Sequence, residues 1–374
     1  MHRIEYRYKR KGKLNIVWLQ KSNKYINLKN PAFDIFQLLA KNTDKELIYR
    51  FLTNKYGFSP DSCKTLVSNL EFEIAKINIP NEEEIELPFN SECSDYYFEP
   101  FSAYSYKYGE SAFSISYENK FLENWLHPII SHLYSDKKED VAFQLEIFNC
   151  DGKIVFREKS AENSVIYPAG KIFQQLAGKL FGKSDNDWLL KAHASAITNH
   201  KKTILISGSS GSGKTTLAAL LLQKGFDLVS DDLVLIDNKI RAFGFPSAMS
   251  VKKGSVEKLM SVFPELATKP EIQLSPEKKV RYLNVGAGKN KSDEVFPVNT
   301  VVFVKYNSGS DFKLTKLSTS KGIRAFLEQA YITPNPDCAE IFLSWAVSAS
   351  FYYLTYSDSD TAIDALLKIL ENDL

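Results

Sequence analysis

The sequence predicts a mixed α/β fold with two domains and a connecting segment, and three observations support this. Residues 203–206 form an apolar strand pattern that leads into a glycine-rich turn and then an apolar helix at 216–223. From residue 188 onward, short strand patterns alternate with helical ones. The first 78 residues show instead three short strand patterns followed by three helical ones, which is the order of a winged-helix-like domain.

Composition excludes several classes of protein. The 374 residues carry 47 Lys and Arg against 45 Asp and Glu, so the formal net charge of +2 gives no global reason to expect nucleic acid. No apolar run approaches a membrane span, and the first residues lack the apolar region of a signal peptide. We therefore expect a cytoplasmic protein that binds neither nucleic acid nor membrane.

The cysteines are scattered without the spacing of a metal site. They are Cys63, Cys93, Cys150 and Cys338. We expect buried free thiols rather than disulfides or zinc ligands.

In the first domain, the strands are expected at residues 4–8, 14–19 and 25–28. Helices are expected to begin near residues 33, 43 and 59. The second opens with a capping box at 43–46 and ends at Gly57. The third carries Leu66, Leu70 and Ile74 on one face.

Residues 17–70 resemble the PqqD-like peptide-recognition domains of ribosomal-peptide maturation pathways, through the segments NPAFDIFQLL and DKELIYRFLTNKYG. That family binds the leader of a precursor peptide as an added strand, against its third helix. The resemblance implies that a precursor peptide docks on residues 1–78, near 17–19, 25–28 and the helix from Asp61. The alternative is a domain that only packs against the rest of the chain.

Residues 79–187 read as an acidic linker followed by an α+β segment that packs on the last domain. Strands are expected at 112–117, 141–149 and 153–157, and helices at 120–134 and 169–181. Asp151-Gly152 lies between two alternating runs and predicts a hairpin turn.

The domain at 188–374 contains the pattern G-x-x-x-x-G-K-[ST] between a strand and a helix. Glycines let backbone N–H groups converge on phosphate oxygens, and the helix start adds favourable partial charge. The residues expected to hold the phosphates of ATP are Gly208, Ser209, Ser210, Gly211, Ser212, Gly213, Lys214, Thr215 and Thr216. Lys214 would reach the β- and γ-phosphates, and the Thr215 hydroxyl would bind Mg²⁺. The alternative is a glycine- and serine-rich loop that matches by chance.

Two adjacent acids, Asp231 and Asp232, follow a strand pattern shortly after this loop. One carboxylate could hold Mg²⁺ while the other accepts the proton of an attacking hydroxyl. The alternative is a polar turn.

The run from His193 to Asp237 resembles HPr kinase/phosphorylase and its related serine kinases, some of which carry PqqD-like domains, and the weaker match extends over 188–370. The resemblance implies a P-loop nucleotide domain, with His193 near the acceptor hydroxyl. It also implies that Asp231 is the catalytic base and Asp232 the Mg²⁺-side carboxylate, although the two roles could be exchanged. From the residues alone, a structural role for His193 is as well supported as a role near the acceptor.

The sequence departs from the HPr enzymes at two points. Thr216 stands where they have Glu, and the glycine- and arginine-containing stretch tied to dephosphorylation is not recognisable. These differences argue against phosphorylase activity and against HPr as the substrate. HPr enzymes assemble as hexamers, so a homo-oligomer is an expectation from the resemblance alone.

Residues 276–288 form a basic stretch that we expect to be a loop. Lys278, Lys279 or Arg281 could stabilise charge on the transferred phosphate, and resemblance to the related kinases favours Arg281 as the catalytic cation. The alternative is a solvated loop. The remaining elements are expected at 299–306, 321–331, 338–349, 351–356 and 361–371.

Together these observations predict an ATP- and Mg²⁺-dependent kinase for a serine or threonine hydroxyl, carried by a precursor peptide. Two alternatives remain: a kinase for a small hydroxyl compound such as free serine, and a nucleotide-dependent scaffold that binds peptide without transferring phosphate.

Overall fold

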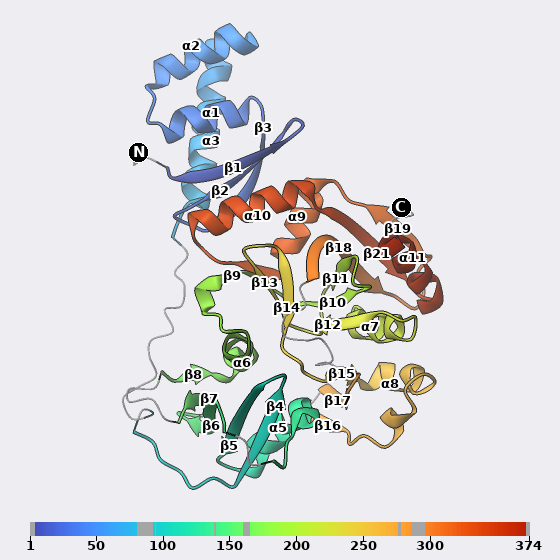
Figure 1. The fold of residues 1–374 in the computed structure, drawn as a ribbon. Helices are drawn as coiled ribbons and strands as arrows, with labels where there is room; N and C mark the ends of the chain where they lie inside the picture. The colour runs from blue at the N-terminus through green and yellow to red at the C-terminus, as the bar shows by residue number, and fades with distance from the viewer. Residues whose placement is uncertain are drawn as a thin grey trace. The chain divides into compact units, whose positions relative to one another are not determined.

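A computed structural model describes residues 4–80, 93, 95–137, 140–159, 165–275, 278–285 and 296–371. Over these residues the protein is a mixed α/β structure with several sheets, as predicted at this level (Figure 1). None of the helices in the described ranges is both long and apolar enough to span a bilayer. The chain divides into two compact units.

Unit 1 contains Met1–Ile85, Leu317–Leu327 and Ile332–Ala349. Its antiparallel sheet has the order β1 (Tyr6–Lys11), β2 (Leu14–Leu19), β3 (Lys24–Lys29). One side of the sheet packs against α1 (Ala32–Ala40), α2 (Lys45–Tyr56) and α3 (Pro60–Ile77) around a core that includes Val17, Phe36 and Leu52. The predicted order of three strands and three helices is confirmed for these segments.

Two details of these helices differ from the prediction. The side chain of Asp44, rather than Thr43, caps α2 by accepting from the Glu46 N–H at 2.9 Å. On α3, Cys63, Val67 and Ile74 are buried, whereas Leu66 is 37 % exposed. The helix is therefore rotated about its axis so that positions 63 and 67, which are four residues apart, face the core more directly than Leu66 does.

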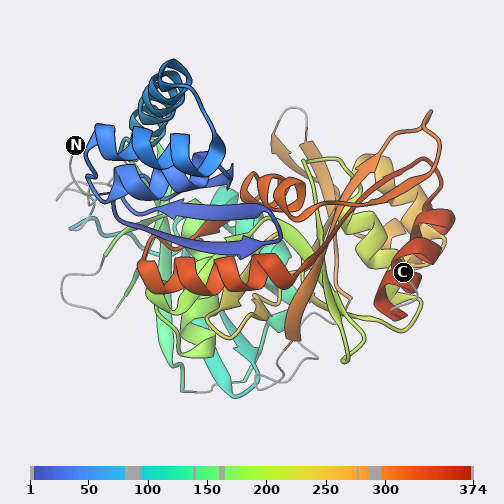
Figure 2. The same cartoon turned by 90° about the horizontal axis from the view of Figure 1, so that it is seen from above.

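Two later helices, α9 (Thr319–Leu327) and α10 (Pro336–Ser348), also belong to unit 1. Figures 1 and 2 show α10 along the face of the sheet opposite α1–α3. Lys11 Nζ donates to the Val347 carbonyl at 2.5 Å, and Tyr25 meets Phe342 edge-on at 5.0 Å. Both faces of this small sheet are therefore covered, which a strand pattern of only six residues cannot reveal.

Unit 2 contains Glu86–Lys316, Glu328–Tyr331 and Ser350–Leu374. Its main sheet runs, among described residues, in the order β12 (Asp227–Ser230), β10 (Ala194–Thr198), β11 (Thr203–Ser207), β18 (Phe296–Tyr306), β14 (Arg241–Gly244), β13 (Val234–Asp237), β9 (Trp188–Ala192), β20 (Ala330–Ile332). In addition, β21 (Ser350–Tyr356) pairs with β18 and with β19 (Lys313–Lys316). β11, β18 and β21 are parallel, and most other pairs are antiparallel, so the sheet is mixed.

Apolar side chains of α7 (Lys214–Leu222), α8 (Lys253–Met260) and α11 (Ser359–Glu371) share one core with this sheet. The pattern of residues 189–197 predicts a single strand, and this prediction is wrong in one respect: the segment breaks at His193 into β9 and β10, which occupy different places in the sheet. A continuous apolar run cannot reveal such a crossover, because both halves are buried.

The second sheet of unit 2 has the order β4 (Ser102–Tyr108), β5 (Ser111–Tyr117), β6 (Phe143–Cys150), β7 (Lys153–Glu158), β8 (Tyr167–Pro168), and packs with α5 (Lys120–Ile130) and α6 (Ile172–Phe181). Asp151 and Gly152 form the predicted hairpin turn, with φ of 49° and 72°. β4 was not predicted. Short 3₁₀ helices lie at Ser131–Leu133, Ala169–Lys171, Asp185–Asp187 and Pro264–Ala267.

A third sheet has the order β15 (Met249–Lys252), β17 (Lys278–Leu283), β16 (Ile272–Ser275). The expected loop at 276–288 is therefore wrong over 278–283, and the rest of it lies outside the described residues except 284–285. The expectation of free thiols is wrong for Cys93 and Cys150, which form a disulfide, and is confirmed for Cys63 and Cys338.

Candidate functional site

A glycine-rich loop joins the end of β11 to the start of α7. Its glycines adopt backbone conformations that side chains rarely allow, with φ of 150° at Gly208, 83° at Gly211 and 97° at Gly213. A Cβ atom on Gly213 would lie 2.0 Å from the Tyr356 hydroxyl, and one on Gly208 would lie 2.7 Å from the Val304 carbonyl. Glycine is therefore required here by close approach as well as by backbone angle. The loop delivers the chain to the first turn of α7, whose N–H groups lack intrahelical partners.

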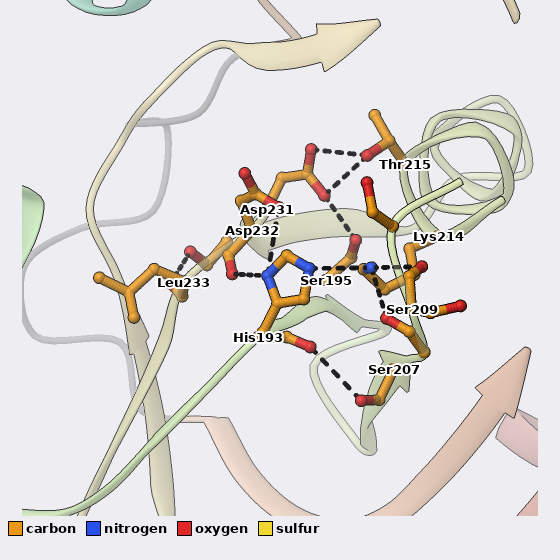
Figure 3. A network of polar contacts seen from close by, with 12 residues as sticks. His193, Ser195, Ser207, Ser209, Lys214, Thr215, Asp231, Asp232 and Leu233 are labelled. Carbon is orange, nitrogen blue, oxygen red and sulfur yellow. Dashed lines mark hydrogen bonds and ion pairs between the residues drawn. The ribbon is translucent and has the colours of Figure 1, made fainter. Parts of the chain in front are cut away.

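Lys214 folds back over this loop. Its Nζ donates to the carbonyls of Gly208 at 2.7 Å and Ser209 at 3.2 Å, and lies 3.1 Å from His193 Nε2 (Figure 3). The residue is 7 % exposed, and burial lowers the pKa of its ammonium group while two nearby carboxylates oppose that shift. The geometry concentrates positive charge at the mouth of the loop.

His193 connects Lys214 to the acidic pair. It lies at the break between β9 and β10, and its backbone N–H donates to the Gln329 carbonyl at 2.8 Å. Its Nδ1 lies 3.1 Å from the Asp232 carbonyl oxygen, which can only accept, so Nδ1 carries the hydrogen. Nε2 then presents a lone pair to the Lys214 ammonium. This arrangement favours the tautomer that carries its hydrogen on Nδ1.

Asp231 is buried behind the loop. Its carboxylate accepts hydrogen bonds from the Ser195 hydroxyl and, at 3.1 Å, from the Thr215 hydroxyl (Figure 3). The net pKa of Asp231 is raised to about 6, mainly by burial and also by the neighbouring Asp232, while the two hydroxyls act in the opposite direction.

Asp232 is placed differently from its neighbour. Its side chain is 63 % exposed and borders the cavity, and its Oδ1 lies 3.4 Å from His193 Nδ1. Its φ of 74° is unusual for a non-glycine residue. The turn thus directs two consecutive carboxylates to two environments, one buried against Thr215 and one beside the cavity.

The loop borders a cavity of about 230 Å³ within unit 2. Four lysines from three segments line it: Lys214, Lys252, Lys258 and Lys278. Lys252 Nζ donates to the Ser210 hydroxyl at 2.7 Å, and the Thr216 hydroxyl donates to Ser255 at 2.8 Å, so α8 and the strand before it are joined to the loop. A cavity with this charge suits a polyanionic ligand.

Most of the predicted site residues border this cavity: His193, Ser210, Gly211, Gly213, Lys214, Thr215, Thr216 and Asp232. Asp231 lies one layer behind them, against Thr215. Arg281 does not line the cavity; its guanidinium donates to the carbonyls of Leu266 at 2.6 Å and Ala267 at 3.2 Å. Its catalytic role stays a prediction, and Lys278 of the same strand has the better position.

Several cavity residues were not predicted, among them Lys252, Lys258, Tyr306 and Tyr356. The two tyrosines end strands that run parallel to β11, so the rule that ligands bind at the carboxyl ends of parallel strands could have identified them. No comparable signal marks the two lysines.

No family model matches the chain, and no curated protein matches it.

Proposed function

We propose that this protein is an ATP-dependent kinase for a serine or threonine hydroxyl, with a P-loop domain of HPr-kinase type and a winged-helix-like domain of PqqD type. The observation that carries the proposal is the cavity in which the glycine loop, Lys214 and three further lysines face one space next to two carboxylates. Such a set can bind a triphosphate and stabilise charge on a transferred phosphoryl group.

The donors around Thr215 fit a magnesium ion. The Thr215 hydroxyl and the Asp231 carboxylate are hard oxygen ligands 3.1 Å apart, the type that Mg²⁺ prefers. Bound Mg²⁺ would neutralise phosphate charge. We therefore assign Asp231 to the metal side and Asp232 to the acceptor side, where its exposed carboxylate would take the proton of the hydroxyl. This exchanges the roles that the family resemblance suggested first.

The acceptor is proposed to be a precursor peptide. In unit 1, β3 pairs with β2 alone among the described strands, so its outer edge has backbone groups for an added strand. Residues 17–19 are fully buried and cannot themselves touch a peptide, which moves the proposed dock to the edge of β3.

The test is a transfer assay with the full chain, ATP and Mg²⁺, offering either a precursor peptide encoded next to this chain or free serine. We expect a phosphate to be added to the peptide, detected by mass. Equal transfer to free serine would reject the peptide as the substrate. Tight ATP binding without any transfer, unchanged by Asp232→Asn, would instead support a scaffold.

A further inference from the structure

Three parallel strands of unit 2 end at the cavity. The glycine loop follows β11, while Tyr306 ends β18 and Tyr356 ends β21. Ligands of open α/β sheets bind beyond the carboxyl ends of such strands. The loop occupies the end of the first strand, which leaves the ends of the other two for a different part of the same ligand.

Tyr306 is exposed and yet held in place. Its backbone N–H donates to the Ser212 carbonyl at 3.0 Å, so the end of β18 is attached to the glycine loop. The residue is 47 % exposed and lines the cavity, and its ring meets the ring of Tyr356 at 5.6 Å in an edge-on arrangement. Tyr356 is buried against Gly213, so it supports Tyr306 from the interior.

The cavity has two chemical parts. Lys252 Nζ donates to the Ser210 hydroxyl of the loop, whereas the backbone N–H of Tyr306 donates to the Ser212 carbonyl and the Tyr356 hydroxyl lies beside Gly213. A ligand with an anionic tail and a flat aromatic head would satisfy both parts. Nucleoside triphosphates have this form, and a flat ring surface next to a phosphate loop suits their base.

We propose that the ring of Tyr306 stacks on the base of the bound nucleoside triphosphate, with Tyr356 supporting it. The inference rests on the proposed nucleotide site and assigns a base-binding residue outside the glycine-rich motif. Stacking on an aromatic side chain corresponds to roughly tenfold or more in affinity.

The experiment measures dissociation constants of the full chain for Mg²⁺-ATP and for Mg²⁺-tripolyphosphate, which lacks a base. Tyr306→Ala should weaken ATP binding roughly tenfold or more and change tripolyphosphate binding less than about twofold. Tyr306→Phe should bind both ligands like the wild type, because the stacking ring is kept. Tyr353→Ala is the matched control, since Tyr353 is a 38 % exposed tyrosine of β21 that does not line the cavity.

The outcomes separate this inference from the proposal on which it rests. If the wild type binds ATP and Tyr306→Ala binds it equally well, the stacking role is rejected while the nucleotide site stands. Equal weakening of ATP and tripolyphosphate would also reject stacking, since it would indicate damage to the loop. A wild-type protein that binds neither ligand would overturn the nucleotide site itself, and stacking with it.

Discussion

Two walls of the cavity hold their polar groups by different means. The loop wall, residues 208–216, is one continuous segment, so its lysine can bond within the segment, where Lys214 Nζ donates to the Gly208 carbonyl. The acid wall consists of His193 and Asp232, which border the cavity, with Asp231 directly behind them; they come from the β9–β10 crossover and from the turn after β12. Its groups depend on contacts between distant segments, such as Ser195 with Asp231.

This difference indicates which groups of the cavity can have their charge altered by their surroundings. The loop wall is one continuous segment, and its lysine donates to two carbonyls of that same segment. The acid wall contains two neighbouring carboxylates whose surroundings differ, so one can change its charge near neutral pH while the other borders the cavity. Substitutions in each wall test whether the two walls have these separate roles.

The largest expected effect is on the loop wall. Lys214→Ala should lower phosphate transfer by about a thousandfold or more, because it removes the buried cation of the loop. The measurement is the transfer rate under saturating ATP and Mg²⁺, with circular dichroism to show that folding is kept. Lys224→Ala, which removes an exposed lysine just after α7, is the control and should transfer at the wild-type rate. A Lys214→Ala variant that retains normal turnover would contradict the assigned role.

The next largest effect distinguishes the two carboxylates of the acid wall. Asp232→Asn should lower the transfer rate about 100-fold or more at every Mg²⁺ concentration, because the proposed proton acceptor is lost. Asp231→Asn should raise the Mg²⁺ concentration needed for half-maximal rate, because a metal-side carboxylate is lost. Titrating Mg²⁺ against rate for both variants measures this. If the two patterns are reversed, Asp231 is the base, as the family resemblance first suggested.

A stability measurement tests the buried acid without any ligand. The pKa of Asp231 is raised to about 6 in the folded protein, above the value of about 3.9 for an unfolded chain. Between these values the unfolded state releases a proton that the folded state keeps, so this group's contribution to stability falls as pH rises from about 4 to about 6 and then stays constant.

The expected loss over that window is on the order of 2–3 kcal/mol. Asp231→Asn cannot ionise, so the difference in unfolding free energy between wild type and variant should shift by this amount, in favour of the variant at higher pH. The substitution also changes the hydrogen bonds with Ser195 and Thr215. That change would add a difference in unfolding free energy that does not follow this pH dependence. Denaturant unfolding at several pH values measures it, and a difference that does not vary with pH would refute the shifted pKa.

The smallest expected effect compares two cations of β17. Lys278→Gln should lower transfer roughly tenfold, since Lys278 lines the cavity and brings a positive charge to it. Arg281→Gln should stay within about threefold of wild type in rate, because its guanidinium is bonded to backbone carbonyls away from the cavity. Both rates are measured in the same assay. A larger loss in Arg281→Gln would restore it as the catalytic cation and would mean that this strand moves during the reaction.

Sequence reasoning succeeded best for segments whose meaning is local. The strands and helices of the first 78 residues were located within a few residues, and the hairpin at Asp151-Gly152 was identified from its dipeptide. It failed where one local pattern of residues is compatible with two different secondary structures. The basic stretch around Lys278 is compatible with a loop or with a strand of a small sheet, and only its pairing with β15 and β16 decides this.

By itself, the sequence determined the glycine loop, its lysine and the adjacent acids, because turn geometry, close approach and helix starts depend on residues next to one another in the chain. Only the tertiary structure decided that His193 lies at a crossover, that Asp231 is buried while Asp232 is exposed, and that Tyr306 and Lys278 share a cavity with the loop. Burial and proximity come from the packing of segments distant in the chain, and no local pattern of residue types encodes that packing.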